Sequence, residues 1–396
     1  MSAKPNWWAC AALLFCVPLA TAEDKDGFVS IFNGKDLSGW HNVNCHPSTF
    51  FVKDGKIITT GKPTGFLRSL KHYENFILEM EWMHINKEEV GNSGLFIWGD
   101  PLPAIGSPYT RGIEVQVLVN LEKENAYTSH GDIFSIWGAT CVPDRPHPMG
   151  WARCLPSERR CKGGGEWNHY RVEAINGSVK LHVNGKEVSG VTKSSPRKGY
   201  IALESEGAEC HFRNIRIKEL PSTQPKATEI AELAKDHLLM FNGLDMTGWE
   251  FSKEHAKQWS YGGGNLRTKA TDRPIPLTFE TPLANGELQF DFRYPEAGKK
   301  TDFQISYGYG PPMGTLTVSP DGNMSANTNP PQTLQGKMGA NWNRLKLVRK
   351  DQSVVVLLNN TSAGTIKDWR QLSKEGKLSI SSKGAIQIMN MYATPE

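Results

Sequence analysis

Residues 167–190, WNHYRVEAINGSVKLHVNGKEVSG, decide the fold class of this chain. They predict two strands joined at Asn176-Gly177, because Asn-Gly is the strongest short-range signal for a β-hairpin turn. A second pair of the same kind follows at Asn184-Gly185. Short antiparallel strands with turns at this spacing are typical of a two-sheet sandwich or a jelly roll.

Two phrases of the sequence occur twice. IFNGKDLSGW at 31–40 is answered by MFNGLDMTGW at 240–249, and the hairpin stretch is answered by WNRLKLVRKDQSVVVLLNNTSAGTI from Trp342. A chain of 396 residues also exceeds what one hydrophobic core usually serves. The repeat therefore predicts two homologous domains, residues 28–220 and a shorter second copy, residues 237–396. Between them PSTQPKATEIAELAKD, residues 221–236, has a Pro- and Thr-rich start and a short helix-like patch, which predicts a linker.

The composition supports an all-β protein and argues against nucleic acid as a partner. Aromatic residues make up 10% of the chain, and Gly and Pro are plentiful. The formal net charge is only +4, with Lys and Arg scattered among Asp and Glu. No basic stripe is present that could follow a phosphate backbone.

The N-terminal residues 1–22 predict a cleaved secretory signal, because a short apolar stretch ends in small residues in an A-x-A pattern. The alternative, a permanent membrane anchor, needs about twenty apolar residues. We therefore expect a periplasmic or secreted protein with no stable membrane span after cleavage. Five cysteines then remain, and for Cys141, Cys154 and Cys161, which crowd one segment, a local disulfide is favoured over a metal site.

Alternation along two stretches predicts strands with one buried and one largely polar face. In NFILEMEWMHI the buried face holds Phe76, Leu78, Met80 and Trp82, and in GIEVQVLVN it holds Ile113, Val115, Val117 and Val119. The opposite faces carry four polar side chains that we expect to line one curved sheet surface: Glu79, Glu81, Glu114 and Gln116.

The phrases FNGKDLSGW, NSGLFIW, GIEVQVL, EWNHYRV, VNGKEV and FRNIRIKEL, in this order, resemble the 3-keto-disaccharide hydrolase domain. The resemblance covers nearly all of residues 28–220, and residues 238–392 look like a second, degenerate copy. It implies a concanavalin A-like jelly roll for each copy, and therefore two such β-sandwiches in tandem.

The resemblance also implies an activity, the cleavage of glycosides whose sugar has first been oxidised at C3. A carbonyl at C3 acidifies the proton on C2, so a base can remove it and expel the C1 substituent, after which water adds to the enone. Such a site needs a base, an acid or cation for the leaving group, and donors for the enolate oxygen. The implied partner is an oxidised sugar or glycan, and no cofactor is required, because another enzyme performs the oxidation.

Glu114 is the first candidate for the base, since alternation places it beside Gln116 on the polar face. The alternatives are a solvated strand glutamate for Glu114 and a cross-strand structural bond for Gln116. His130 and Asp132 in SHGDIFSIWGA lie in an expected loop, where they could protonate the leaving group or simply form a turn.

Five more residues are candidates for substrate binding. Glu79 and Glu81 would repel Glu114 unless Arg68 or a divalent metal ion lies between them. Asn92 could bind substrate or shape the start of its strand, and Trp98 could stack on a sugar or cap the core. The rival function is a lectin-like envelope protein that holds polysaccharide without cleaving it, because fold alone does not decide between the two.

Overall fold

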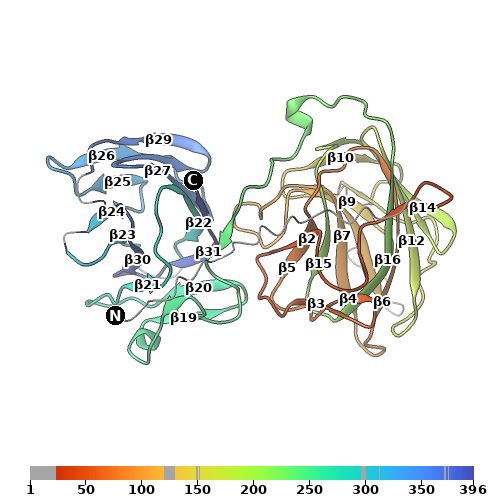
Figure 1. The fold of residues 1–396 in the computed structure, drawn as a ribbon, viewed down its shortest axis with the longest axis horizontal. Helices are drawn as coiled ribbons and strands as arrows, with labels where there is room; N and C mark the ends of the chain where they lie inside the picture. The colour runs from red at the N-terminus through yellow and green to blue at the C-terminus, as the bar shows by residue number, and fades with distance from the viewer. Residues whose placement is uncertain are drawn as a thin grey trace, which may run out of the picture.

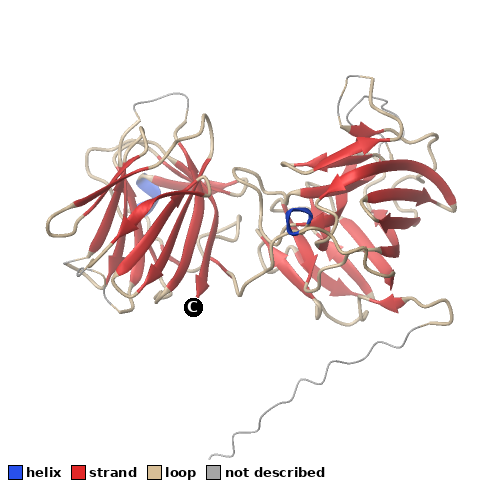
Figure 2. Ribbon diagram, turned by 90° about the horizontal axis from the view of Figure 1, so that it is seen from above, coloured by secondary structure: helices blue, strands red, loops and turns tan. Residues whose placement is uncertain are grey.

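A computed structural model describes residues 24–396 except 120–129, 149, 151, 296–299, 312, 370, 371 and 373. The predicted signal, residues 1–22, lies outside this range. Nearly all regular structure in the described part is β-strand, arranged as four antiparallel sheets that form two sandwiches (Figures 1 and 2). The described part is thus nearly all-β and forms two β-sandwiches, in agreement with the predicted fold class.

The first sandwich contains a nine-stranded sheet, ordered β10-β14-β13-β12-β6-β16-β4-β3 with β1 on β16, and a seven-stranded sheet, ordered β11-β9-β8-β7-β15-β5-β2. Its strands are β1 (Val29–Ser30), β2 (Trp40–Val43), β3 (Phe50–Lys53), β4 (Lys56–Thr59), β5 (Gly65–Ser69), β6 (Phe76–His84), β7 (Gly91–Gly99), β8 (Gly112–Val119), β9 (Ile133–Ile136), β10 (Thr140–Pro143), β11 (Arg153–Cys154), β12 (Asn168–Ile175), β13 (Ser178–Val183), β14 (Lys186–Ser195), β15 (Tyr200–Ser205) and β16 (Cys210–Glu219).

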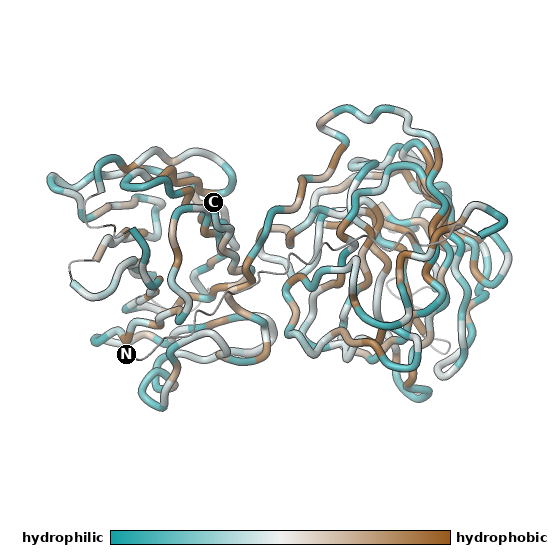
Figure 3. The backbone as a smooth tube through the Cα atoms, viewed as in Figure 1, coloured by the Kyte–Doolittle hydropathy of each residue, from teal (hydrophilic) through white to brown (hydrophobic). Residues whose placement is uncertain are grey.

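The predicted hairpin is the β12–β13 pair. Asn176 and Gly177 both have positive φ, 50° and 75°, as a type I′ turn requires. Strand β6 alternates between buried and half-buried residues along its whole length. Its buried side chains, Trp82 among them, meet the inward face of β8 in one hydrophobic core, and apolar segments run through the interior of both sandwiches (Figure 3).

The second sandwich follows an almost identical plan. Its sheets are ordered β19-β20-β31-β22-β27-β28-β29, with β17 on β31, and β18-β21-β30-β23-β24-β25-β26. The strands are β17 (Leu238–Leu239), β18 (Trp249–Glu250), β19 (Trp259–Gly262), β20 (Asn265–Thr268), β21 (Leu277–Phe279), β22 (Gly286–Arg293), β23 (Phe303–Gly308), β24 (Gly314–Val318), β25 (Asn323–Ala326), β26 (Gln332–Gln335), β27 (Asn343–Lys350), β28 (Ser353–Leu358), β29 (Thr361–Ile366), β30 (Lys377–Ser382) and β31 (Gln387–Pro395), with a 3-10 turn η2 (His255–Lys257).

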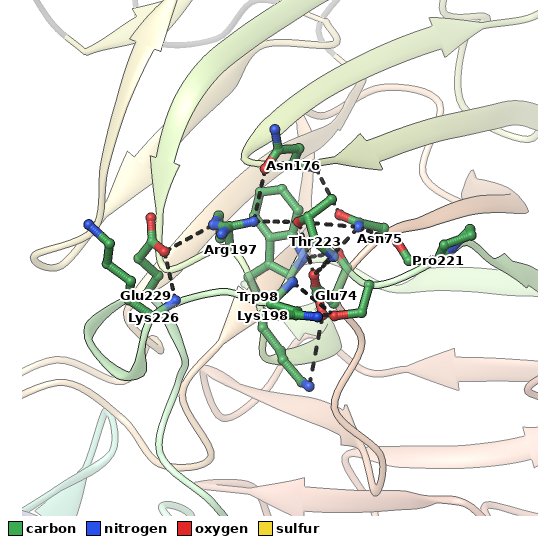
Figure 4. A network of polar contacts seen from close by, with 12 residues as sticks. Glu74, Asn75, Trp98, Asn176, Arg197, Lys198, Pro221, Thr223, Lys226 and Glu229 are labelled. Carbon is green, nitrogen blue, oxygen red and sulfur yellow. Dashed lines mark hydrogen bonds and ion pairs between the residues drawn. The ribbon is translucent and has the colours of Figure 1, made fainter.

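The segment between the domains is bound to the first sandwich. Its helix-like patch forms only the 3-10 turn η1 (Ala227–Glu229). Glu74 accepts hydrogen bonds from Ser222 Oγ at 2.6 Å and from Thr223 N at 2.7 Å, and Asn75 Nδ2 donates to the Pro221 carbonyl at 2.7 Å (Figure 4). The linker is therefore an ordered strap that lies along one end of the first sandwich.

The domains also share a small apolar cluster. Tyr392 of β31 and Leu239 of β17 pack with Val43, Phe66 and Phe96 on the outer face of the seven-stranded sheet. That face is the one opposite the core, and the second domain covers part of it.

The cysteines differ from expectation. All five in the described part are free thiols, so the expected local disulfide among Cys141, Cys154 and Cys161 is absent. Burial raises the pKa of the Cys161 thiol to about 12, although a bond to Tyr170 opposes this shift. The described residues contain no helix that is long and apolar enough to cross a membrane.

Candidate active site

Two carboxyl groups converge on the outer face of the seven-stranded sheet. Glu114 on β8 lies opposite Phe96 on β7, and Phe96 lies opposite Ala202 on β15, two residues before Glu204. A Cβ placed on Gly94 would lie 2.9 Å from both Glu114 Oε1 and Glu204 Oε2. Gly94 therefore leaves the space in which the two carboxyl groups meet.

A third carboxylate, Glu206, follows directly after β15. It accepts a hydrogen bond from the Tyr109 hydroxyl at 2.7 Å and another from Asn92 Nδ2. Asn92 Oδ1 in turn accepts a 2.7 Å hydrogen bond from Gln116 Nε2. Asn92 thus links the Glu206 carboxylate to the side-chain amide of Gln116 on β8.

The cation in this cluster is Arg153 of β11. Its Nε donates to Asp132 Oδ2, and its Nη2 lies 3.3 Å from Gln116 Oε1. The guanidinium also lies 4.3 Å from the centroid of the Phe134 ring. Arg153 therefore holds positive charge beside the carboxyl groups, the role that the sequence suggested for Arg68.

Burial raises the pKa of three carboxyl groups here, those of Glu114, Glu204 and Asp132. Burial, with the negative charges of Glu206 and Asp132, raises the pKa of Glu114 to about 8, while Arg153 opposes the shift. Burial and the charges of Glu114 and Glu206 raise the pKa of Glu204 well above its usual range. Burial also raises the pKa of Asp132 to about 6, again against Arg153. A carboxyl group that titrates near neutral pH can act as a general base or a general acid.

Glu79 and Glu81 do not belong to this cluster, so the expected convergence with Glu114 is wrong. Both lie on β6, in the opposite nine-stranded sheet. Glu79 accepts hydrogen bonds from Arg171 and Arg216, while Glu81 accepts one from Arg213. Their strand alternates correctly, but alternation does not say which of the two sheets a strand joins.

Trp98 and Arg68 do not join this cluster either, and for Trp98 the alternative of capping the core is correct. Trp98 is fully buried, and its Nε1 donates to the Glu74 carbonyl at 2.8 Å, so it caps the core. Arg68 lies on the same sheet as Glu114 but packs over the Tyr200 ring, 4.6 Å from its centroid. There it lines a cavity of about 950 Å³ between the domains, which does not include Glu114.

Asp132, directly before β9, is brought to the cluster through Arg153, and both Asp132 and His130 are buried. Gly131 between them has a φ of 82°, so the alternative of a turn is also correct. Three residues were missed: Arg153, Glu204 and Glu206. The alternation in ALESE, residues 202–206, was a usable signal for the two glutamates. Within the described ranges no group of three or more His, Cys, Asp or Glu side chains could hold a metal ion.

The chain was compared with known proteins. Residues 27–218 match the model of a family described as the 3-keto-alpha-glucoside-1,2-lyase-like domain. A 3-keto-disaccharide hydrolase of Bacteroides thetaiotaomicron is 24% identical over 252 residues, which are 50% of this chain and 80% of the relative. The first domain of this chain is therefore similar to this family over nearly its whole length.

Two solved structures are similar over about half of the chain. A candidate glycosyl hydrolase from Parabacteroides distasonis has 23% identity and a TM-score of 0.39, and the match covers 50% of this chain and 95% of the other. A carbohydrate-binding module from Bacillus subtilis has 16% identity and a TM-score of 0.33, with 46% and 96% covered. The similarity to the lyase-like family comes from the family model and the Bacteroides relative.

Proposed function

We propose that the first domain hydrolyses 3-keto-glycosides. Its family and the name of the Bacteroides relative support this substrate class. The observation that carries the proposal is the buried pair of Glu114 and Glu204, which meet above Gly94 with raised pKa values. One member of such a pair can take up a proton while the other gives one away.

In the proposed mechanism, the Glu114 carboxylate takes the C2 proton and the C2–H electrons form an enolate with C3. The enolate electrons then return to make C1=C2 and C3=O, and the bond from C1 to the aglycone oxygen breaks. Protonated Glu204 donates its proton to that oxygen. Water adds its hydroxyl to C1 and its proton to Glu204. Glu114 exchanges the proton it has taken with water and then returns a solvent proton to C2. One water is consumed, and a 3-keto sugar and an alcohol are released.

The surrounding side chains have supporting roles in this proposal. Arg153 supplies N–H donors near the carboxyl pair, and such preorganised donors are suited to an enolate oxygen. Gln116 orients Arg153 through its Oε1 and donates its own N–H groups to Asn92 and Ser93. Asp132 accepts a hydrogen bond from Arg153, so we assign it the orientation of that guanidinium rather than the predicted acid role. His130 is kept as the second candidate for the acid.

We also propose that the second domain shares its origin with the first but lacks this chemistry. The repeated phrases and the matching strand orders support the common origin. By topology β24 corresponds to β8, and a direct alignment sets Leu316 and Val318 against Glu114 and Gln116. Both residues are buried in the core, so the outward positions on β24 belong to Thr315 and Thr317. Neither can serve as a carboxylate base.

The proposal is tested by incubating the purified full chain with 3-keto-trehalose or 3-keto-glucosides, with and without a chelator, and measuring released 3-keto-glucose. We expect release. If the protein instead binds unoxidised glycans and releases nothing, the lectin-like alternative is correct. A loss of activity with chelator would add a metal ion that the described side chains do not reveal.

We propose further that the chain is exported, on the basis of the signal-like residues 1–22. Mass spectrometry of the native protein should find an N-terminus near Glu23 in the periplasm or the medium. Retention of residues 1–22 would refute this proposal.

A further inference from the structure

A second cavity, of about 280 Å³, lies between the domains and is lined mainly by polar residues. The first domain contributes the β7–β8 connection and the loop after β9, and the linker contributes Glu232. The second domain contributes β22, β27 and the turn between β28 and β29. We call it the inter-domain pocket and define it by six of its lining residues: Asp100, Arg111, Trp137, Gln289, Lys346 and Asn360.

Gln289 gives this pocket an unused hydrogen-bond donor. The residue is only 7% exposed, and its Nε2 has no hydrogen-bond partner among the described residues. It lies on β22 opposite Lys346 of β27. A buried amide donor without a partner is unfavourable, so a native protein normally satisfies it with a ligand or water.

Trp137 gives the pocket an aromatic surface. The side chain is 50% exposed, and the backbone has a φ of 49°, a conformation that is uncommon for a bulky residue. The indole stacks on the Tyr109 ring with centroids 6.3 Å apart and planes inclined by 25°. The Tyr109 hydroxyl donates to Glu206, so Tyr109 lies between Trp137 and the carboxyl cluster.

Asp100 and Arg111 supply further polar groups at the pocket. Arg111 binds the Asp100 carboxylate with two hydrogen bonds, 2.7 and 2.9 Å long. Such a bidentate pair fixes the orientation of both groups, and the carboxylate oxygens keep lone pairs for hydroxyl donors. Hydroxyl groups of a neutral ligand fit this arrangement.

The second domain holds the wall of the pocket in place. Asp291 Oδ2 accepts a 2.8 Å hydrogen bond from Gly106 N, and Arg344 Nη2 donates to the Pro103 carbonyl at 2.8 Å. Asn390 Nδ2 donates to the Ser107 carbonyl at 2.9 Å. Asp291 and Arg344 are also paired with each other. The β7–β8 connection is thus bound at several backbone positions, and the pocket is formed before any ligand arrives.

We propose that the inter-domain pocket is a saccharide subsite, which binds an uncharged sugar ring of a disaccharide or longer glycoside. The ring would stack on Trp137 and direct hydroxyl groups to Gln289 and Asp100, a combination of one aromatic face and a few placed polar groups that is common in small-molecule sites. The binding of a sugar in this pocket does not depend on the proposed function. The further statement that this sugar is the leaving group of a cleaved glycoside does rest on the proposed function. The second domain, by this account, takes part in substrate selection.

The direct test measures the binding of unoxidised trehalose and glucose to the full chain by saturation-transfer NMR. The variants are Trp137→Ala and Gln289→Leu, and the matched control is Gln352→Leu, at an exposed turn of the same domain. We expect the two pocket variants to weaken binding at least tenfold and the control to bind like wild type. No binding to wild type, or unchanged binding to both pocket variants, would overturn the proposal.

Kinetics separate this proposal from the proposed function. With 3-keto-trehalose, the pocket variants should raise KM at least fivefold and leave kcat within twofold, with melting temperatures close to wild type. If the chain cleaves no 3-keto-glycoside but the pocket variants still lose sugar binding, the proposed function fails and the subsite remains. If kcat falls and sugar binding is unchanged, the pocket residues only hold the β7–β8 connection in place. The proposed subsite is then refuted.

Discussion

Glu114 shows how strongly one residue depends on its surroundings. Its sequence position predicted an outward-facing carboxylate on a polar face. In the structure it does face outward from the core, but it is buried beside other carboxyl groups, which raises its pKa to about 8. The folded protein therefore holds a proton on this group that the unfolded chain would release at neutral pH.

Glu114→Gln should lose activity and gain stability. An amide cannot accept the C2 proton, and general-base catalysis is typically worth about a hundred- to ten-thousand-fold. The raised pKa of Glu114 also means that stability falls as pH rises from the usual glutamate range through about 8, and the amide removes this cost. At pH 7 we expect a gain on the order of 1–3 kcal/mol in the free energy of unfolding, measured by denaturant titration.

The matched control for this variant is Glu81→Gln, on the opposite sheet. Its turnover should equal that of wild type. Wild-type turnover in Glu114→Gln would mean that the base is a different residue, and a lower stability would mean that Glu114 is ionised in the folded state.

The pH dependence of kcat/KM should report the same group. Because the carboxylate form of Glu114 is the base, kcat/KM should rise with pH and level off above about pH 8, where the group is ionised. The charge of Glu206 contributes to the raised pKa, so Glu206→Gln should move the rising limb to lower pH. A falling limb through the same range would instead identify Glu114 as the acid.

At the scale of the strands, β7, β8 and β15 bring the carboxyl groups together, and Gly94 on β7 permits the approach. Gly94→Ala would push a methyl group to within 2.9 Å of both carboxyl oxygens. Overpacking of this kind typically costs about 1–3 kcal/mol, and we expect at least a tenfold loss of turnover. The control Gly339→Ala, whose Cβ would have its nearest neighbour at 3.5 Å, should leave both quantities unchanged. Wild-type turnover in Gly94→Ala would refute the shared site.

Strands and turns were predictable from sequence because their signals are local. The hairpin at Asn176-Gly177 and the alternation of β6 and β8 follow from neighbouring residues. The placement of Glu79 was not predictable in this way, because sheet membership depends on pairings between distant strands. Arg153 was missed for the same reason, since β11 meets β9 only in the folded sheet.

At the scale of the whole molecule, the linker and the inter-domain contacts join the two sandwiches. The linker is exposed, with Lys226 accessible, yet several hydrogen bonds hold it to the first domain (Figure 4). The sequence predicted only a linker here. Its composition does not reveal that Glu74 and Asn75, in the connection between β5 and β6, bind it. Its binding to Glu74 makes the arrangement of the domains testable by proteolysis.

Glu74→Ala should expose the linker to trypsin after Lys226. The variant removes the acceptor of the Ser222 and Thr223 hydrogen bonds, and a hydrogen bond to a charged group contributes about 1.5–3 kcal/mol. We expect trypsin to cleave the folded variant at least ten times faster than it cleaves wild type. The cleavage rate is measured by gel electrophoresis. The control Glu88→Ala, in an exposed turn, should match wild type. Equal rates in Glu74→Ala and wild type would show that the strap is held by other contacts.

The central claim is that Glu114 removes the C2 proton of a 3-keto-glycoside, and the fate of that proton tests it most directly. The measurement follows 3-keto-trehalose carrying deuterium at C2, in ordinary water, with wild type and Glu114→Gln. The account predicts that wild type transfers deuterium to water in step with the release of 3-keto-glucose, and that Glu114→Gln slows both by about a hundred- to ten-thousand-fold. Release of 3-keto-glucose that retains its C2 deuterium, or deuterium loss at the wild-type rate in Glu114→Gln, would contradict it.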